Sequence, residues 1–92
     1  GLDVGMHTLI RPALYGAYHP IVNLSKLHEP PAWKVDVVGP ICESGDVLGH
    51  DRWMPESEVG DVVLIANAGA YGASMASHYN LRAPAREVLL LA

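Results

Sequence analysis

A thiol and two carboxylates lie close together near the middle of the chain. Cys42 is followed directly by Glu43, and Asp46 comes after a serine and a glycine. A thiol held over a reacting carbon can act as a general acid, and a neighbouring carboxylate can hold a substrate ammonium group. Free cysteine is also among the most buried residue types, so core packing is the other role open to Cys42. These residues alone leave the two interpretations even.

Arg11 and Tyr15 form a second candidate pair, near the start of the chain. Residues four apart lie near one face if the segment is helical. An arginine can bind a carboxylate or phosphate through two parallel hydrogen bonds, and a tyrosine hydroxyl can add a third. On spacing alone, an ordinary surface arginine beside a packed tyrosine is the favoured interpretation.

Small residues predominate in the segment 67–72, which contains Tyr71 and follows an apolar run. Backbone N–H groups in such a segment can approach a ligand closely and cradle a phosphate. The spacing matches neither the dinucleotide fingerprint nor the P-loop. Turn chemistry by itself favours a plain tight turn.

Five histidines raise the question of a metal site. No two of them have the close spacing of a His-x-x-x-His pair, and the single cysteine excludes an internal disulfide and any site built on a cysteine pair. We therefore expect no metal site, although distant histidines could still meet in the fold.

Composition limits the chain to one domain, residues 1–92, with much apolar surface. Half of its residues are hydrophobic and only 17% are charged, which is apolar for so small a body. We expect another surface to cover part of it; the alternative is a well-packed monomer with scattered apolar side chains on its outside.

Charge and hydropathy exclude two classes of partner. The net charge is −4 and the six basic residues are scattered, so we expect no binding to nucleic acid. No apolar run is long enough to span a bilayer, and the start lacks a secretion-signal pattern. We expect a soluble, cytoplasmic protein without membrane contact.

The elements that would position these residues are short and mostly strands. The patterns predict strands over residues 19–24, 33–38, 62–66 and 87–91, and a further short strand to which Val47 and Leu48 belong. They predict helical turns over 12–17 and 71–77, and loops over 25–32, 52–59 and 81–85. This count favours a mainly β fold, a small β-barrel or sandwich with one or two short helices.

Three strings of residues, in order and nearly from end to end, resemble diaminopimelate decarboxylases. They occupy residues 3–15, 38–46 and 68–80, and contain Leu-Ile-Arg-Pro-Ala-Leu-Tyr, Gly-Pro-Ile-Cys-Glu-Ser-Gly-Asp and Ala-Gly-Ala-Tyr-Gly. His7 departs from the family pattern, and residues 81–86 look less regular than in the family.

The resemblance implies a fold and an activity. The family consists of fold-type III pyridoxal-phosphate enzymes, in which an N-terminal (β/α)₈ barrel precedes a C-terminal β domain and homodimers share their active sites. They convert meso-diaminopimelate to L-lysine and carbon dioxide. This chain would be the C-terminal β domain, and without the barrel we expect it to be catalytically inactive.

The resemblance also implies roles for five residues. Arg11 and Tyr15 would bind the substrate, Cys42 would donate a proton in the partner subunit's site, and Glu43 would contact the distal amino group. Tyr71 would lie near the cofactor and the substrate. Pyridoxal phosphate would be held mainly by the barrel, since neither lysine of this chain stands in a matching motif.

Two alternatives remain open. One is a decarboxylase of the ornithine or arginine type, although those enzymes usually carry aspartate after the cysteine, where this chain has Glu43. The other is a non-catalytic β module for assembly or regulation. The joint presence of the five site residues speaks against that module, because a scaffold does not need them.

Overall fold

Four strands and two short helices make up the part of the chain that the structure describes. The computed structural model describes residues 1–83 and 85–89, and of residues 70 and 71 it describes only the backbone. The elements are α1 (Arg11–Tyr15), β1 (Ile21–Asn23), β2 (Trp33–Val38), β3 (Val47–Met54), β4 (Val63–Ile65) and α2 (Gly69–Met75), with 3₁₀ turns η1 (Leu24–Lys26) and η2 (Tyr79–Leu81).

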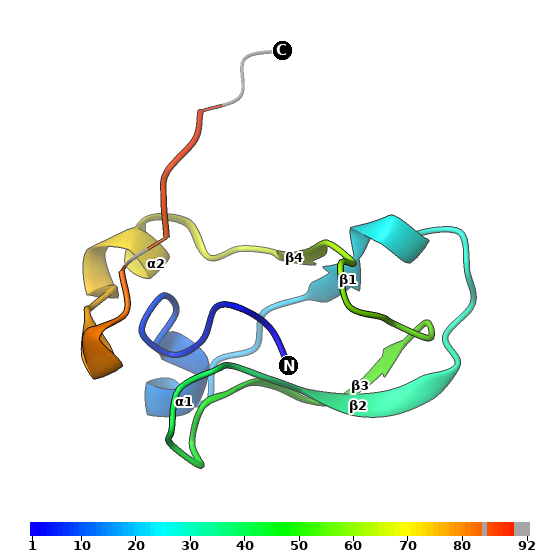
Figure 1. The fold of residues 1–92 in the computed structure, drawn as a ribbon, viewed down its shortest axis with the longest axis horizontal. Coiled ribbons are helices and arrows are strands. Elements are labelled where there is room, and N and C mark those ends of the chain that lie inside the picture. Colours follow the sequence, from blue (N-terminus) through cyan, green and yellow to red (C-terminus); the bar gives the residue numbers. More distant parts are fainter. Residues whose placement is uncertain (84, 90–92) are drawn as a thin grey trace.

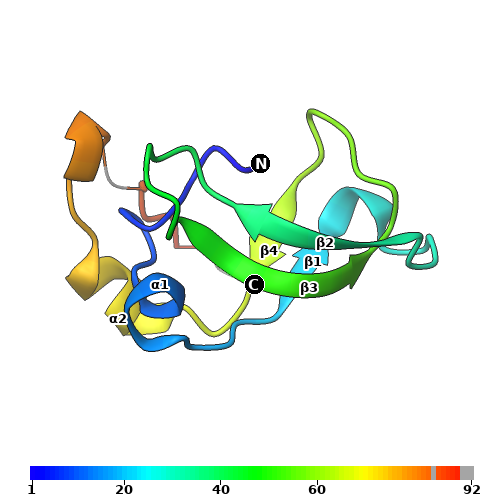
Figure 2. The ribbon, with the colours of Figure 1, turned by 90° about the horizontal axis from the view of Figure 1, so that it is seen from below.

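The strands form two antiparallel ladders that pack across one core. β2 pairs with β3 as a hairpin, and β1 pairs with β4, which is distant in sequence. The β1–β4 ladder lies above the β2–β3 hairpin in Figure 1, and Figure 2 shows the hairpin from below. The cluster of buried side chains is small and comprises Leu9, Val37, Leu48 and Met54. This arrangement confirms the mainly β fold with short helices.

The helix α1 and the β1–β4 ladder agree with the expected positions at their centres. α1 starts at Arg11, one residue before the expected start, and has Pro12 in its first turn. It ends at Tyr15 and is capped by Gly16, whose φ is +66°. A hydrogen bond from the Ala66 N–H to the Pro20 carbonyl continues the β1–β4 ladder beyond the ends of the two strands. α2 begins two residues before the expected helix.

The strand β3 contains Val47 and Leu48 as expected, and it corrects the loop expected over residues 52–59, because it continues to Met54. Its pairing with β2 shifts register twice: Val35 pairs with Arg52, Val37 with Gly49 and Val38 with Val47. The extra residues on β3 bend the strand and shift the side-chain alternation, so the sequence loses the period of two. Asp51 adopts φ +52° there.

The strand expected over residues 87–91 is not formed in its described part. Residues 87–89 carry no strand pairing, and 90–91 lie outside the described residues. Val88 and Leu89 are exposed, and the segment rises away from the body of the molecule (Figure 1). A strand needs a neighbour for its backbone groups, and this segment has none among the described residues. None of the described helices has the length and apolar character that crossing a membrane requires.

Candidate functional site

The turn between β2 and β3, residues 39–46, presents the thiol and one carboxylate outward. Gly39 and Asp46 close it through a 3.0 Å backbone hydrogen bond, and further backbone bonds fold it internally. Ile41 is buried beneath the turn, whereas Cys42 and Glu43 are exposed. Core packing, one of the two roles open to Cys42, is therefore wrong, and both groups are accessible to a ligand.

Asp46 anchors this turn to the N-terminal segment. Its carboxylate is buried and accepts hydrogen bonds from the backbone N–H groups of Met6, at 2.7 Å, and Ile41, at 2.8 Å. A Cβ atom on either Gly5 or Gly39 would overlap that carboxylate. The second carboxylate of the sequence pattern is thus a structural group. Sequence reasoning missed this, because the contact with residues 5 and 6 joins segments about forty residues apart.

The helix α1 carries the second candidate pair. Arg11 is half-buried, and Tyr15 is exposed. One helical turn separates the two residues, and α1 packs against β3. Tyr15 thus lies in the expected helix, and Arg11, expected just before that helix, is its first residue. What the two residues bind stays a prediction.

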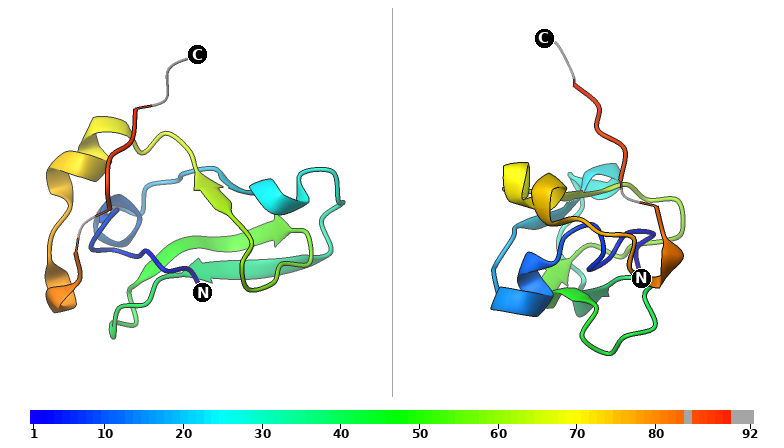
Figure 3. Two further views of the ribbon diagram at one scale, coloured as in Figure 1. Left: turned by 45° about the horizontal axis from the view of Figure 1, so that its top comes forward. Right: turned by 90° about the vertical axis from the view of Figure 1, so that its left-hand side faces the viewer.

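Several segments that carry candidate residues gather at one end of the molecule. α1, α2, η2 and the 39–46 turn all lie at this end, and η1 lies at the opposite end (Figures 1 and 3). One contact among them involves a residue that sequence reasoning left without a role. The Tyr79 hydroxyl in η2 lies 3.4 Å from Oε2 of Glu43 and donates a hydrogen bond to it. The only sequence signal for Tyr79 was its place inside one of the three matched strings.

The cofactor candidate Tyr71 has its backbone in α2, and its side chain lies outside the described part of the structure. The preceding segment is tightly turned, with φ of +60° at Asn67 and +43° at Gly69. These values agree with the predicted turn. Whether the segment cradles a phosphate stays a prediction.

The two lysines of the chain lie in other surroundings. Lys26, in η1 at the opposite end, bonds to Asp61 at 3.2 Å and to Glu58 at 3.3 Å. The hydrogen bond to Asp61 raises the pKa of Lys26. Lys34 is exposed in β2, where it pairs with Trp53. That the barrel would hold most of the cofactor stays a prediction. Among the described residues, no three His, Cys, Asp or Glu side chains cluster as metal ligands.

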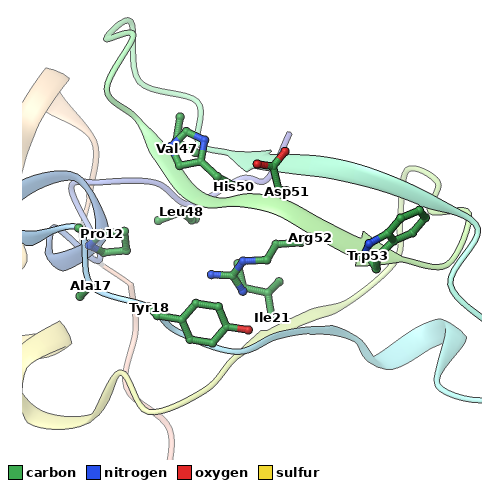
Figure 4. Close-up of a pocket in the computed structure, with 11 residues that line it drawn as sticks. Pro12, Ala17, Tyr18, Ile21, Val47, Leu48, His50, Asp51, Arg52 and Trp53 are labelled. Carbon is green, nitrogen blue, oxygen red and sulfur yellow. The ribbon is translucent and has the colours of Figure 1, made fainter.

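A groove of about 520 Å³ lies next to α1, between β3 and the segment that leads from α1 to β1 (Figure 4). Arg52 enters it, places its guanidinium 4.0 Å from the centre of the Tyr18 ring and donates to the His19 carbonyl at 2.8 Å. Its lining includes Pro12 but none of the five candidate residues. This groove is therefore not formed by the five candidate residues.

Comparison with known proteins gives a consistent result. Residues 1–69 match the family model of the C-terminal sheet domain of pyridoxal-dependent decarboxylases. The chain is 50% identical over 90 residues to the diaminopimelate decarboxylase of Methanothermobacter thermautotrophicus, which covers 98% of this chain and 21% of that protein. The chain thus spans about a fifth of the length of this relative.

Solved structures agree in fold. The diaminopimelate decarboxylase of M. jannaschii in complex with L-lysine matches with a TM-score of 0.81 and 48% identity, over 89% of this chain and 18% of that one. The lysine/ornithine decarboxylase of Vibrio vulnificus, complexed with cadaverine, matches with a TM-score of 0.76 and 26% identity, over 91% and 22%. The chain therefore belongs to the pyridoxal-dependent decarboxylase family and corresponds to the C-terminal sheet domain of its diaminopimelate decarboxylases.

Proposed function

We propose that residues 1–92 are the C-terminal domain of a cytoplasmic, homodimeric, pyridoxal-phosphate-dependent enzyme that converts meso-diaminopimelate to L-lysine and carbon dioxide. A barrel domain and a second subunit complete its active site. The observation that carries this proposal is the 39–46 turn, in which a buried carboxylate fixes the backbone while Cys42 and Glu43 project outward. Such a turn presents reactive groups to a site that another surface closes.

The choice of substrate rests on identity and on one residue. The chain is 48–50% identical to two diaminopimelate decarboxylases but 26% identical to the lysine/ornithine decarboxylase. Glu43 follows the cysteine, and its carboxylate is long enough to reach a distal ammonium group from an exposed turn. Diaminopimelate carries such an ammonium group on its second amino-acid centre.

Each candidate residue has a task that suits its chemistry. Arg11 and Tyr15 bind a substrate carboxylate through charge-assisted hydrogen bonds. Glu43 binds the distal ammonium group. Cys42 acts as the general acid that delivers a proton to the carbon from which carbon dioxide has left. Pyridoxal phosphate, when bound, supplies the electron sink for this reaction, and Tyr71 lies beside it.

The thiol needs surroundings that this chain alone does not supply. Cys42 is exposed on this chain and is not among the described residues that line the groove beside α1. In the assembled enzyme the barrel of the second subunit excludes water around the thiol. With water excluded, the thiol has no competing proton donor at the reacting carbon.

A complementation assay tests the proposal. The chain is mixed with a separately expressed barrel domain and pyridoxal phosphate, and release of carbon dioxide from meso-diaminopimelate is measured. We expect activity that Cys42→Ala lowers strongly and that Ser44→Ala, a change in the same exposed turn, preserves. Binding to the barrel without activity on any substrate would favour an assembly module. Activity on ornithine or arginine instead would overturn the substrate assignment.

A further inference from the structure

The side chain of Glu43 has a partner outside its own turn. Within the turn, its backbone N–H donates to the Ile41 carbonyl at 2.8 Å and its carbonyl accepts from the Asp46 N–H at 3.0 Å. These bonds fix the backbone and leave the direction of the carboxylate open. The Tyr79 hydroxyl, 36 residues away in sequence, reaches Oε2 at 3.4 Å. The direction of the carboxylate is thus set from η2.

Both partners are fixed to neighbouring residues of the N-terminal segment. The turn that holds Glu43 is anchored where the Met6 N–H donates to Asp46 at 2.7 Å. The segment before η2 is anchored where the Ser77 N–H donates to the carbonyl of His7 at 2.8 Å, and His7 is itself buried. Because the two anchors are adjacent in sequence, the backbone of the 39–46 turn and that of the segment before η2 are held next to each other.

The conformation of η2 holds Tyr79 toward the turn. The N–H of Tyr79 donates to the Ser77 hydroxyl at 3.3 Å, and Leu81 bonds back to the His78 carbonyl at 2.8 Å. Asn80 and Leu81 both adopt positive φ, near +60°, which reverses the chain directly after the tyrosine. The orange η2 and the green 39–46 turn lie at the same end of the molecule in the left-hand view of Figure 3.

We propose that Tyr79 is a positioning residue that orients the Glu43 carboxylate for the distal ammonium group of the substrate. The inference rests on the proposed function, in which Glu43 binds that group. A phenol donates one hydrogen bond to one carboxylate oxygen and leaves the second oxygen with all its lone pairs for the ammonium. The separation of 3.4 Å shortens when substrate draws the carboxylate into place, as in other sites that tighten on binding. Tyr79 acts on substrate through Glu43 and is not a catalytic residue.

The test uses the complete enzyme, with this chain joined to its barrel domain, and the variants Tyr79→Phe, Glu43→Gln and the double variant. We expect Tyr79→Phe to raise KM for meso-diaminopimelate about three- to tenfold and to change kcat less than about twofold, because one hydrogen bond to a ground-state contact is lost. Tyr18→Phe, at an exposed tyrosine whose ring packs on Arg52, is the matched control and leaves both parameters unchanged.

Two inhibitors separate positioning from a general structural effect. L-lysine retains the distal amino group and 6-aminohexanoate lacks it. Tyr79→Phe should therefore raise the inhibition constant of L-lysine by the same factor as KM and leave that of 6-aminohexanoate unchanged. In the Glu43→Gln background, Tyr79→Phe should add nothing.

The outcomes distinguish this inference from the proposed function. If Glu43→Gln raises KM but Tyr79→Phe does not, the positioning role is overturned and the role of Glu43 stands. Equal weakening of both inhibitors, or an undiminished effect in the Glu43→Gln background, also overturns it. If Glu43→Gln itself leaves KM and lysine inhibition unchanged, the role of Glu43 in the proposed function fails first, and that of Tyr79 with it.

Discussion

The Cys42 thiol lies exposed on a turn whose backbone the core fixes from below. We predict that Cys42→Ala in the complete enzyme lowers kcat about 10²- to 10⁴-fold, the usual contribution of a general acid. Cofactor binding should persist, because the chain's thiol is not among the groups that hold the cofactor in the proposed function. Steady-state kinetics and the absorbance of bound pyridoxal phosphate measure the two effects. Unchanged turnover would exclude the proton-donor role.

Asp46 gives a prediction about stability at the same turn. Its buried carboxylate accepts two backbone N–H groups, and the amide nitrogen of an asparagine cannot accept either. Asp46→Asn should lower the free energy of unfolding by about 1–3 kcal/mol, the cost of leaving a buried donor unpaired. Urea denaturation of the chain measures this change.

Asp3→Asn is the matched control for Asp46→Asn, since it removes an exposed carboxylate from the same N-terminal segment. It should shift the urea midpoint little. Equal midpoints for the two variants would show that the contacts of Asp46 do not anchor the turn.

At the residue scale, the sequence predicted which side chains are candidates but not how they are held. Cys42 and Glu43 stood out because thiols and carboxylates carry chemistry wherever they lie. The roles of Asp46 and Tyr79 depend on contacts with residues 36 to 40 positions away, and no local pattern encodes such contacts. The sequence shows that residue 5 is glycine, but it does not show that the Asp46 carboxylate occupies the place where a Cβ atom of residue 5 would lie.

At the element scale, a polar cluster joins η1 to the loop before β4. Asp61 accepts hydrogen bonds from Asn23 at 2.9 Å, from the Glu58 N–H at 3.1 Å and from Lys26 at 3.2 Å. The pKa of Asp61 is lowered below its ordinary 3.8, and the hydrogen bond from Asn23 is the largest cause. The pKa of Lys26 is raised above its ordinary 10.5, and the hydrogen bond to Asp61 is the largest cause.

These shifts predict a limited pH window for the stability that the cluster contributes. The contribution of Asp61 is present above pH 3.8 and is lost as the pH falls through the lower folded-state pKa. That of Lys26 is present below pH 10.5 and is lost as the pH rises through the higher folded-state pKa. Asp61→Asn should therefore lower stability at neutral pH and converge with the wild type in acid.

Urea unfolding of both proteins from about pH 2 to pH 9 measures this convergence. Asp3→Asn controls for the loss of one negative charge. A difference between Asp61→Asn and the wild type that stays constant down to the lowest pH would show that the Asp61 carboxylate is not stabilised by its hydrogen bonds.

The elements also show which strands the sequence pattern alone can predict. β2 was predicted at its observed bounds, because its side chains alternate and Gly39 and Pro40 end it. β3 was not, because its bulge places His50 and Asp51 against β2 and breaks the alternation. Asp36 stabilises this bulge, accepting the Asp51 N–H at 3.0 Å. A bulge is fixed by the partner strand, so a single strand's pattern cannot reveal it.

At the scale of the whole molecule, the core is small and can be reached from outside. A groove of about 450 Å³ runs between the N-terminal segment, β4 and α2, and is mostly apolar. Leu9 and Leu48 belong to the core cluster and also line this groove. Large apolar side chains such as Val62 and Leu81 are exposed elsewhere. The apolar composition of the sequence is thus visible as surface that the chain does not cover.

We therefore predict that the isolated chain self-associates and that a barrel domain suppresses the self-association, because exposed apolar area of this extent is costly in water. Sedimentation velocity over a range of concentrations, with and without the barrel, measures this. Ala73→Glu places a charge at the groove and should shift the chain toward monomer, whereas Ala13→Glu, on the exposed side of α1 and outside the groove lining, should not. A chain that stays strictly monomeric at high concentration would show that its exposed apolar surface does not drive self-association. Equal effects of the two variants would mean that association uses a face other than the groove, and would leave that groove without a part in assembly.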